Sequence, residues 1–146
     1  MTSSQTVNIL LVEDDTIDAK AFMRAFEKLK VANPITLARD GVEAWEILTG
    51  DNGQGALPRP NLIILDINMP RMNGLELLQK IRDNEKLRDS IVFVLTTSND
   101  EQDKFEAYNL NVAGYMLKSD VENSFVRAVE LVDNYWRVVE FPNEKA

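Results

Sequence analysis

Short runs of apolar, mostly branched residues alternate along the chain with longer segments in which apolar positions recur every three or four residues. The runs occupy residues 8–12, 35–38, 62–65, 91–95 and 113–117. The first, third and fourth runs are almost continuously apolar, which is typical of parallel strands covered on both faces by helices. The strict alternation predicts an α/β fold, a doubly wound five-stranded parallel sheet with strand order 2-1-3-4-5.

The segments between the runs predict helices with one apolar side. The apolar positions are Ile17, Ala21, Phe22, Ala25, Phe26 and Leu29 after the first strand, and Leu75, Leu77, Leu78 and Ile81 after the third. A final helix is predicted from about Val121 to Glu140, because Pro142 disfavours helix at the residue before it. Residues 50–61 contain several glycines and prolines and are predicted to form a long loop.

Length and composition narrow the classes of protein. The chain has 146 residues and is predicted to form a single domain over 1–146. Its core should cover 7–140, followed by a short polar tail at 141–146. No apolar run approaches the roughly 20 residues of a membrane span, and the absence of a secretory signal predicts a cytoplasmic location. The chain has no cysteine and no histidine, which excludes disulfides and thiol catalysis. A net charge of -8 argues against nucleic-acid binding and favours cations and basic partner surfaces.

Residues that can carry chemistry follow four of the predicted strands. The first strand leads into Glu13 and Asp14, the third into Asp66, the fourth into Thr96 and the fifth into Lys118. In an open α/β sheet, ligands bind beyond the carboxyl ends of the strands. We therefore expect these side chains to meet in one crevice.

Taken singly, these residues have ordinary structural explanations. Asp15 can cap the next helix with help from Asp18, the threonine hydroxyl can satisfy a turn, and the lysine can lie on the surface. Taken together, they indicate a phosphoryl site. Glu13 and Asp14 facing Asp66 would repel one another unless a cation offset their charge, and magnesium prefers such oxygen ligands. A carboxylate nucleophile, a metal, an ammonium group and a hydroxyl are the groups that phosphoryl transfer requires.

Asp66 is the candidate nucleophile. It stands alone at the end of an apolar strand, and a carboxylate can accept a phosphoryl group as an acyl phosphate. Asn68, two residues later, is placed to offer its main-chain carbonyl oxygen to the metal. Asn73-Gly74 is predicted to make a tight turn before the next helix.

Three segments resemble the response-regulator receiver domain of two-component signalling. They are ILLVEDD at 9–15, LDINMPRMNG at 65–74 and GYMLK at 114–118. The likeness extends over residues 7 to about 140. It implies the flavodoxin-like receiver fold, a phosphoacceptor switch rather than an enzyme, a sensor histidine kinase as partner, and no output domain. It makes Asp66 the phosphorylated aspartate, and it assigns Mg²⁺ to Glu13, Asp14, Asp66 and the main-chain oxygen of Asn68.

The same resemblance assigns the switch. Lys118 would bind the phosphoryl group, Thr96 would move its hydroxyl toward it, and Tyr115 would be the aromatic residue whose rotamer follows the threonine. The chain looks most like the small stand-alone regulators paired with bacterial phytochromes, because it has a long loop after the second helix, Lys118-Ser119, and a terminal segment at 135–142. Most receivers have proline where this chain has Ser119.

The last predicted helix has more apolar surface than one packed face needs. Its core stripe comprises Val121, Phe125, Val129, Val132, Trp136 and Val139. Leu131, Tyr135 and Val138 form a flanking stripe. This stripe is covered either by long side chains and the tail of the same chain or by a partner protein. Wide apolar patches on small domains usually mark contacts, so a homodimer through this helix is the favoured hypothesis.

Three other readings compete with the receiver. A phosphatase with an aspartate nucleophile would need an acid two residues after Asp66, where the chain has Asn68. A flavin-binding electron carrier would need a phosphate loop after the first strand, where Glu13, Asp14 and Asp15 would repel the phosphate. An unphosphorylated receiver-like scaffold is the third alternative, and the intact set of site residues argues against it.

Overall fold

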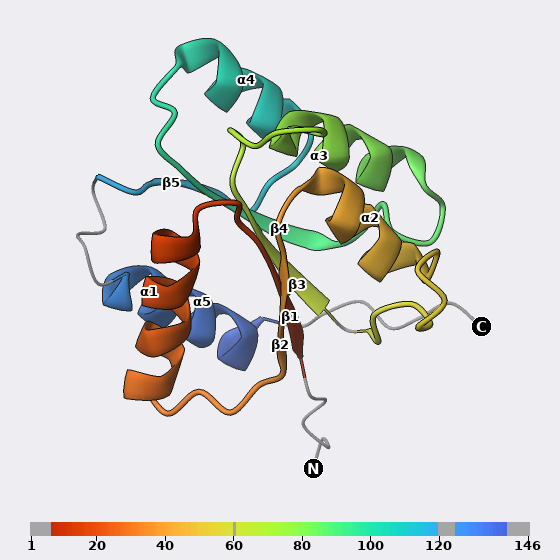
Figure 1. The fold of residues 1–146 in the computed structure, drawn as a ribbon. Helices are drawn as coiled ribbons and strands as arrows, with labels where there is room; N and C mark the ends of the chain where they lie inside the picture. The colour runs from red at the N-terminus through yellow and green to blue at the C-terminus, as the bar shows by residue number, and fades with distance from the viewer. Residues whose placement is uncertain (1–6, 60, 120–124, 140–146) are drawn as a thin grey trace.

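The computed structural model describes residues 7–59, 61–119 and 125–139. In this part of the chain, five strands alternate with five helices (Figure 1). In chain order they are β1 (Asn8–Val12), α1 (Thr16–Lys28), β2 (Ile35–Ala38), α2 (Gly41–Thr49), β3 (Asn61–Leu65), α3 (Gly74–Asp83), β4 (Ile91–Thr96), α4 (Glu101–Asn109), β5 (Gly114–Leu117) and α5 (Val126–Val138). None of these helices is long and apolar enough to cross a membrane.

The sheet has the predicted topology. Every strand pairing is parallel and the order is β2-β1-β3-β4-β5, so the predicted fold class is confirmed. β1, β3 and β4 lie inside the sheet, which explains why their sequences are almost continuously apolar. The strand bounds differ from the predicted runs by at most one residue.

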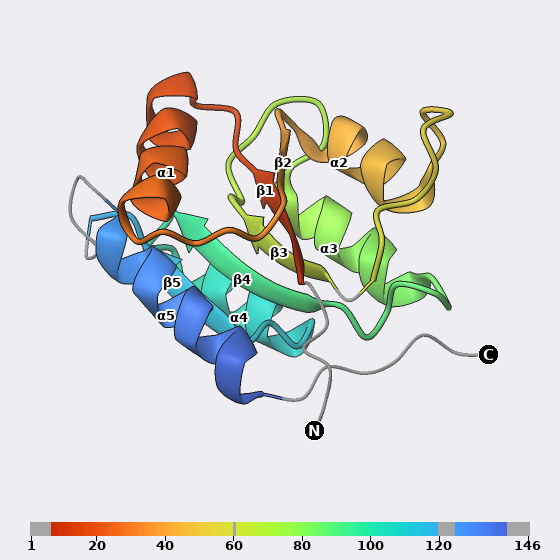
Figure 2. The ribbon, with the colours of Figure 1, turned by 90° about the horizontal axis from the view of Figure 1, so that it is seen from below.

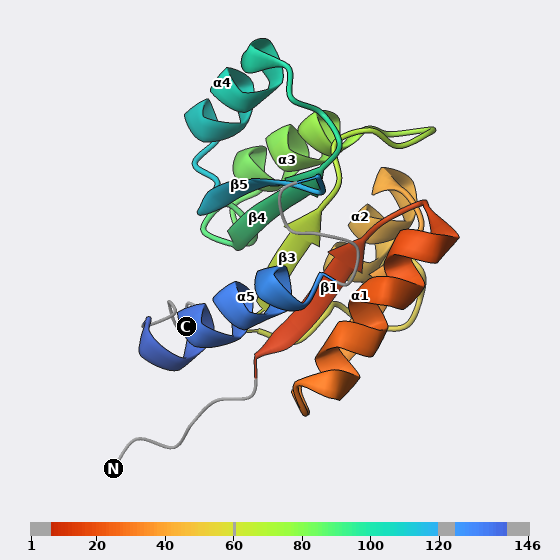
Figure 3. The same cartoon turned by 90° about the vertical axis from the view of Figure 1, so that its left-hand side faces the viewer.

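One layer of helices covers each face of the sheet (Figures 2 and 3). α1 and α5 pack together on one face, where Phe22, Phe26 and Val129 are almost completely buried against the strands. α2, α3 and α4 cover the other face, where Leu78 and Ile81 are completely buried. Both faces of the central strands are therefore closed to water, and the polar residues at the strand ends lie at the edge of this core.

The predicted apolar face of α1 is wrong at one position. Ile17 is 79% exposed, and Ala19 is buried in its place. The helix begins at Thr16, behind the N-cap Asp15. Two residues correspond to about 200° of rotation around an α-helix, so Ile17 points away from the sheet when Ala19 faces it.

The predicted start of the last helix is also wrong. α5 begins at Val126, because Phe125 has a φ of 56° in the left-handed region and breaks the helical path. A continuous helix from Val121 is therefore excluded, although Val121 itself and Glu140 lie outside the described residues. Phe125 still buries its ring in the core, as the stripe predicted.

Arg82, near the end of α3, ties two loops to each other. Its Nε donates to the carbonyl of Leu110 at 2.6 Å, and its Nη1 donates to those of Arg88 at 2.7 Å and Ser90 at 2.8 Å. Its Nη2 donates to the carbonyl of Asn111 at 3.0 Å. One guanidinium thus fixes the entry to β4 and the segment before β5, the two strands that carry the threonine and the lysine of the site.

Candidate functional site

The register of the sheet brings the predicted site residues to one edge. Val12 pairs with Leu65, so Glu13 and Asp66 emerge from neighbouring strands at the same level. The Asp66 amide donates to the carbonyl of Val12 at 3.0 Å, which continues the strand pairing into the site. The sequence alone predicted this meeting, because both acids directly follow a strand.

Glu13, Asp14 and Asp66 form an acidic cluster. Each offers a carboxylate oxygen, and these oxygens all lie within 4.8 Å of one another. Glu13 and Asp66 are each only 4% exposed, whereas Asp14 is more accessible. A buried set of oxygen donors with one open side fits a hard divalent cation such as magnesium, which keeps some of its water.

Lys118 supplies the positive charge of the site. Its Nζ lies 2.7 Å from Glu13 Oε1, 2.7 Å from Asp18 Oδ2 and 3.1 Å from Asp66 Oδ2, and only 9% of its side chain is exposed. The predicted juxtaposition of Lys118 with the acids is therefore present. The contact with Asp18 was not anticipated, because the sequence suggested only a helix-capping role for that residue.

Burial and charge shift the protonation of this cluster. Burial raises the pKa of Glu13 to about 8; the hydrogen bond from Lys118 opposes the shift and the negative charge of Asp66 adds to it. Burial alone would lower the pKa of Lys118, but hydrogen bonds to Asp18 and Glu13 and the charge of Asp66 outweigh it, so that pKa is raised. Lys118 therefore stays charged beside the three acids.

The two predicted switch residues, Thr96 and Tyr115, both form hydrogen bonds with the main chain of Ser98. Thr96 is completely buried, and its hydroxyl accepts a hydrogen bond from the Ser98 amide at 3.3 Å. The Tyr115 hydroxyl donates to the Ser98 carbonyl at 2.9 Å. The Lys118 amide donates to the Thr96 carbonyl at 2.8 Å, but among the described residues no hydrogen bond joins the Thr96 hydroxyl to Asp66 or Lys118. No sequence pattern indicated that Ser98 would hydrogen-bond to both residues.

The loop between β3 and α3 carries Asn68 and is fixed at both sides. The Asn68 amide donates to Asp66 Oδ1 at 3.2 Å, so the main chain at residue 68 lies against the acidic cluster. Arg71 donates to Asp40 through Nε at 2.8 Å and Nη2 at 3.2 Å, and these bonds hold the pKa of Asp40 below its usual range. The Arg71 pair connects the loop to the N-cap of α2.

Gly74 lets α3 start directly against the site. A Cβ at this position would lie 2.4 Å from the main-chain oxygen of Asp66 and 2.7 Å from the Cα of Ile67. Asn73 caps the helix, and Glu76 completes a capping box with it. The predicted turn at Asn73-Gly74 is thus a helix start, and glycine is required there for close approach rather than for an unusual φ.

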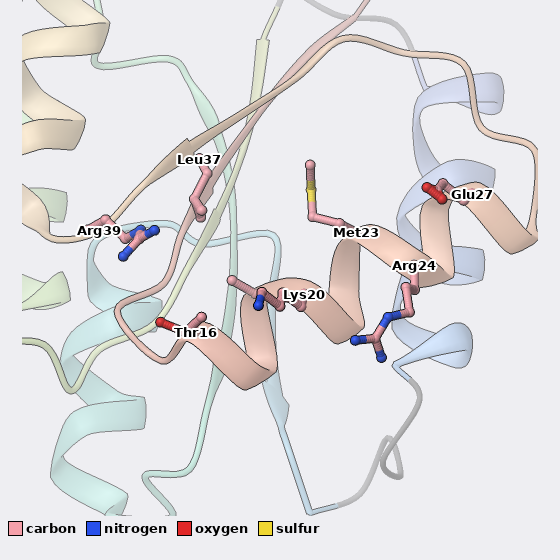
Figure 4. Close-up of a pocket in the computed structure, with 8 residues that line it drawn as sticks. Thr16, Lys20, Met23, Arg24, Glu27, Leu37 and Arg39 are labelled. Carbon is pink, nitrogen blue, oxygen red and sulfur yellow. The ribbon is translucent and has the colours of Figure 1, made fainter.

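A groove lies between α1 and β2, away from the acidic cluster (Figure 4). It has a volume of about 320 Å³, and its lining combines Lys20, Arg24 and Arg39 with the apolar side chains of Met23 and Leu37. It shares no lining residue with the acidic cluster.

The predicted interface on α5 is only partly exposed. Leu131 is 50% exposed and Val138 is 81% exposed. Tyr135 instead packs its ring edge-on against Phe93 of β4, with the centroids 5.0 Å apart. The exposed stripe is therefore narrower than predicted. The stripe residue Trp136 belongs to α5, but its side chain lies outside the described part of the structure.

Comparisons with known proteins give a consistent result. The family profile "Response regulator receiver domain" matches residues 9–130. The chain is 34% identical to Response regulator Rcp1 of Synechocystis sp. over 128 residues, which cover 88% of this chain and 87% of that protein. It is 40% identical to the probable methanogenesis regulatory protein FilR2 of Methanothrix harundinacea over 129 residues, covering 88% and 82%.

Solved structures agree with the sequence matches. The Mn²⁺-bound form of Rcp1 has a TM-score of 0.82 at 34% identity and covers 94% of this chain and 99% of its own. The phosphorylated cyanobacterial phytochrome response regulator RcpA has a TM-score of 0.83 at 32% identity and covers 95% and 100%. The bacteriophytochrome response regulator RtBRR has a TM-score of 0.74 at 37% identity and covers 95% and 85%.

These findings set aside the hydrolase and the flavin carrier. The acidic cluster offers the oxygen donors that a divalent-metal site needs, and a receiver implies a cognate histidine kinase as its partner. The function is that of a phosphoacceptor switch, not of an enzyme that turns over a substrate. The chain belongs to the response regulator receiver family.

Proposed function

We propose that the receiver is phosphorylated on Asp66, with Mg²⁺ bound by Glu13, Asp14, Asp66 and the main-chain oxygen of Asn68. The observation that carries this proposal is the position of the Asp66 carboxylate, which is 4% exposed and lies beside both the acidic pair and the Lys118 ammonium. Bound Mg²⁺ would neutralise charge on the transferring phosphoryl group.

In the transfer step, the Asp66 carboxylate attacks the phosphorus of the phosphodonor. One Asp66 oxygen forms a bond to phosphorus, while the bond from phosphorus to the nitrogen of the kinase phosphohistidine breaks and its electron pair returns to the imidazole. The Lys118 ammonium, 3.1 Å from Asp66 Oδ2, is placed to bind an oxygen of the new acyl phosphate. Thr96 and Tyr115, joined through Ser98, would register the added charge by changing the β4–α4 loop.

The kinase partner is proposed to be a phytochrome. The support is the likeness to RcpA, a cyanobacterial phytochrome response regulator, and to RtBRR, a bacteriophytochrome response regulator. Phosphotransfer from a purified phytochrome kinase, measured beside an unrelated histidine kinase, tests this. Equal rates from the two kinases would count against the assignment.

Incubation with acetyl phosphate and Mg²⁺, followed by intact-mass measurement, tests the site. The wild-type chain should gain one phosphoryl group as acetate leaves, and Asp66→Asn should gain none. Asp51→Asn is the matched control, because it makes the same change in an exposed loop and should be phosphorylated like wild type. A phosphoryl group that persists on Asp66→Asn would refute the assignment.

A homodimer through α5 is also proposed. Its support is the pair of exposed apolar side chains Leu131 and Val138 on this helix. Sedimentation at tens of micromolar, with and without acetyl phosphate, should show a dimer that Val138→Glu weakens. Ile17→Glu, an equally exposed position on α1, should leave the dimer intact. A wild-type chain that sediments as a monomer in both conditions would exclude the dimer.

A further inference from the structure

Asp18 contacts Lys118, although Asp18 is not one of the predicted site residues. Its Oδ2 lies 2.7 Å from Lys118 Nζ and joins the first turn of α1 to the end of β5. The main chain of Asp18 is fixed, because its amide donates to Asp15 Oδ1 at 2.9 Å in the helix cap. The Asp18 side chain is 28% exposed, whereas only 9% of the Lys118 side chain is exposed.

The three acceptors around Lys118 are not equivalent. An ammonium group has three N–H donors, and here they meet three carboxylates, Glu13, Asp18 and Asp66. Glu13 and Asp66 belong to the acidic cluster whose oxygens converge for a cation, and Asp18 does not. An oxygen that serves a divalent cation is a weaker acceptor for an ammonium. Asp18 is therefore the acceptor that stays fully available to Lys118 whether or not the acidic cluster holds a cation.

We propose that Asp18 is a positioning residue that anchors the Lys118 ammonium beside Asp66 while Glu13 and Asp66 serve a divalent cation. This proposal rests on the proposed function, in which Lys118 binds the phosphoryl group. Asp18 acts through Lys118 and does not touch the phosphoryl group. If it were instead only a further negative charge near the site, it would repel an incoming phosphodonor. Anchoring of Lys118 would speed phosphorylation, whereas repulsion of the phosphodonor would slow it. Removing the Asp18 carboxylate therefore distinguishes the two effects.

The chain offers a matched control. Asp18→Ala removes the contact with Lys118 together with one negative charge. Asp15→Asn removes one negative charge from the same helical turn, and asparagine caps a helix as well as aspartate does. No contact between Asp15 and Lys118 is present among the described residues. A difference between the two variants therefore reports the contact rather than the charge.

The first measurement is the proton–nitrogen NMR signal of the Lys118 ammonium in the Mg²⁺-loaded protein, without any phosphodonor. Lys118→Arg identifies the signal by its loss. Wild type and Asp15→Asn should show slow exchange of the ammonium protons with water, because a charged hydrogen bond protects them. Asp18→Ala should exchange at least about tenfold faster. Unchanged exchange in Asp18→Ala would overturn the proposal.

The second measurement is the rate of phosphorylation by acetyl phosphate at saturating Mg²⁺. Asp18→Ala should react about tenfold more slowly than wild type, while Asp15→Asn should stay within about twofold. A faster reaction in Asp18→Ala would show that repulsion dominates and would overturn the proposal. A wild-type chain that gains no phosphoryl group would refute the proposed function instead, and the ammonium exchange would still report whether Asp18 anchors Lys118.

Discussion

Replacing Gly74 by alanine sets two physical effects against each other. Gly74 is the first residue of α3 and its φ is not in the left-handed region, so helix propensity alone would make alanine better by up to about 1 kcal/mol. The packing predicts the reverse. The new Cβ would lie 2.4 Å from the Asp66 main-chain oxygen and 2.7 Å from the Ile67 Cα, where ordinary contacts exceed 3.4 Å.

The cost of this overlap follows from what surrounds it. Both partners are main-chain atoms, and neither can rotate away as a side chain would. β3 is completely buried and the capping box holds the start of α3, so the two elements must be pushed apart. Overpacking of this kind costs about 1–3 kcal/mol, and two rigid partners place it at the upper end. After the gain in helix propensity, Gly74→Ala should destabilise the chain by about 2 kcal/mol.

Two assays test the prediction. Thermal unfolding should show a Tm about 4–8 °C lower in Gly74→Ala, because about 1 kcal/mol corresponds to roughly 2–4 °C in a chain of this size. Phosphorylation by acetyl phosphate should slow by about tenfold or more, since Asp66 itself is displaced. Gly53→Ala is the control: its φ of 84° costs stability, but no atom lies near its Cβ, so its phosphorylation rate should not change. An unchanged or higher Tm in Gly74→Ala would refute the steric argument.

Two further predictions concern protonation and loop anchoring. Because the pKa of Glu13 rises from its ordinary 4.5 to about 8 in the folded chain, the folded state retains a proton that the unfolded state has lost; the metal-free protein should therefore lose stability as pH rises from about 4.5 to 8. Urea unfolding should show this slope in wild type and a flatter one in Glu13→Gln or with Mg²⁺; equal slopes in all three would contradict it. Arg82→Lys should lose about 2 kcal/mol in the same assay, since an ammonium cannot reach all four carbonyls, and unfolding like wild type would contradict this.

The fold and the acidic cluster could be predicted because both depend on patterns local in sequence. Continuous apolar runs identify buried parallel strands, and a residue directly after such a strand must lie at the sheet edge. Glu13, Asp66 and Lys118 each directly follow a strand, so their proximity could be predicted without knowing how their side chains are oriented. The strand bounds were predicted to within one residue for the same reason.

The remaining features depend on tertiary contacts that no local pattern encodes. Asp18 reaches Lys118 across 100 residues, and its sequence context indicates only a helix start. The start of α5 also depends on a feature that no local pattern encodes. Its pattern is helical well before Val126, but Phe125 adopts a left-handed φ, and this sets the start of the helix. The partial burial of Tyr135 depends on Phe93, which comes from a different element.

The main chain of Ser98 connects the two predicted switch residues, Thr96 and Tyr115. Its amide proton goes to the Thr96 hydroxyl and its carbonyl oxygen to the Tyr115 hydroxyl, so both bonds engage the main chain of one residue. Displacing Ser98 to break one bond therefore strains the other. In thermodynamic terms, the two side chains share a coupling free energy, and a bias applied at either must appear at the other with the same magnitude. With the proposed roles, signal detection at the buried Thr96 and signal display at the partly exposed Tyr115 would be reciprocal, and a ligand that immobilised Tyr115 should change the affinity of the proposed phosphorylation site.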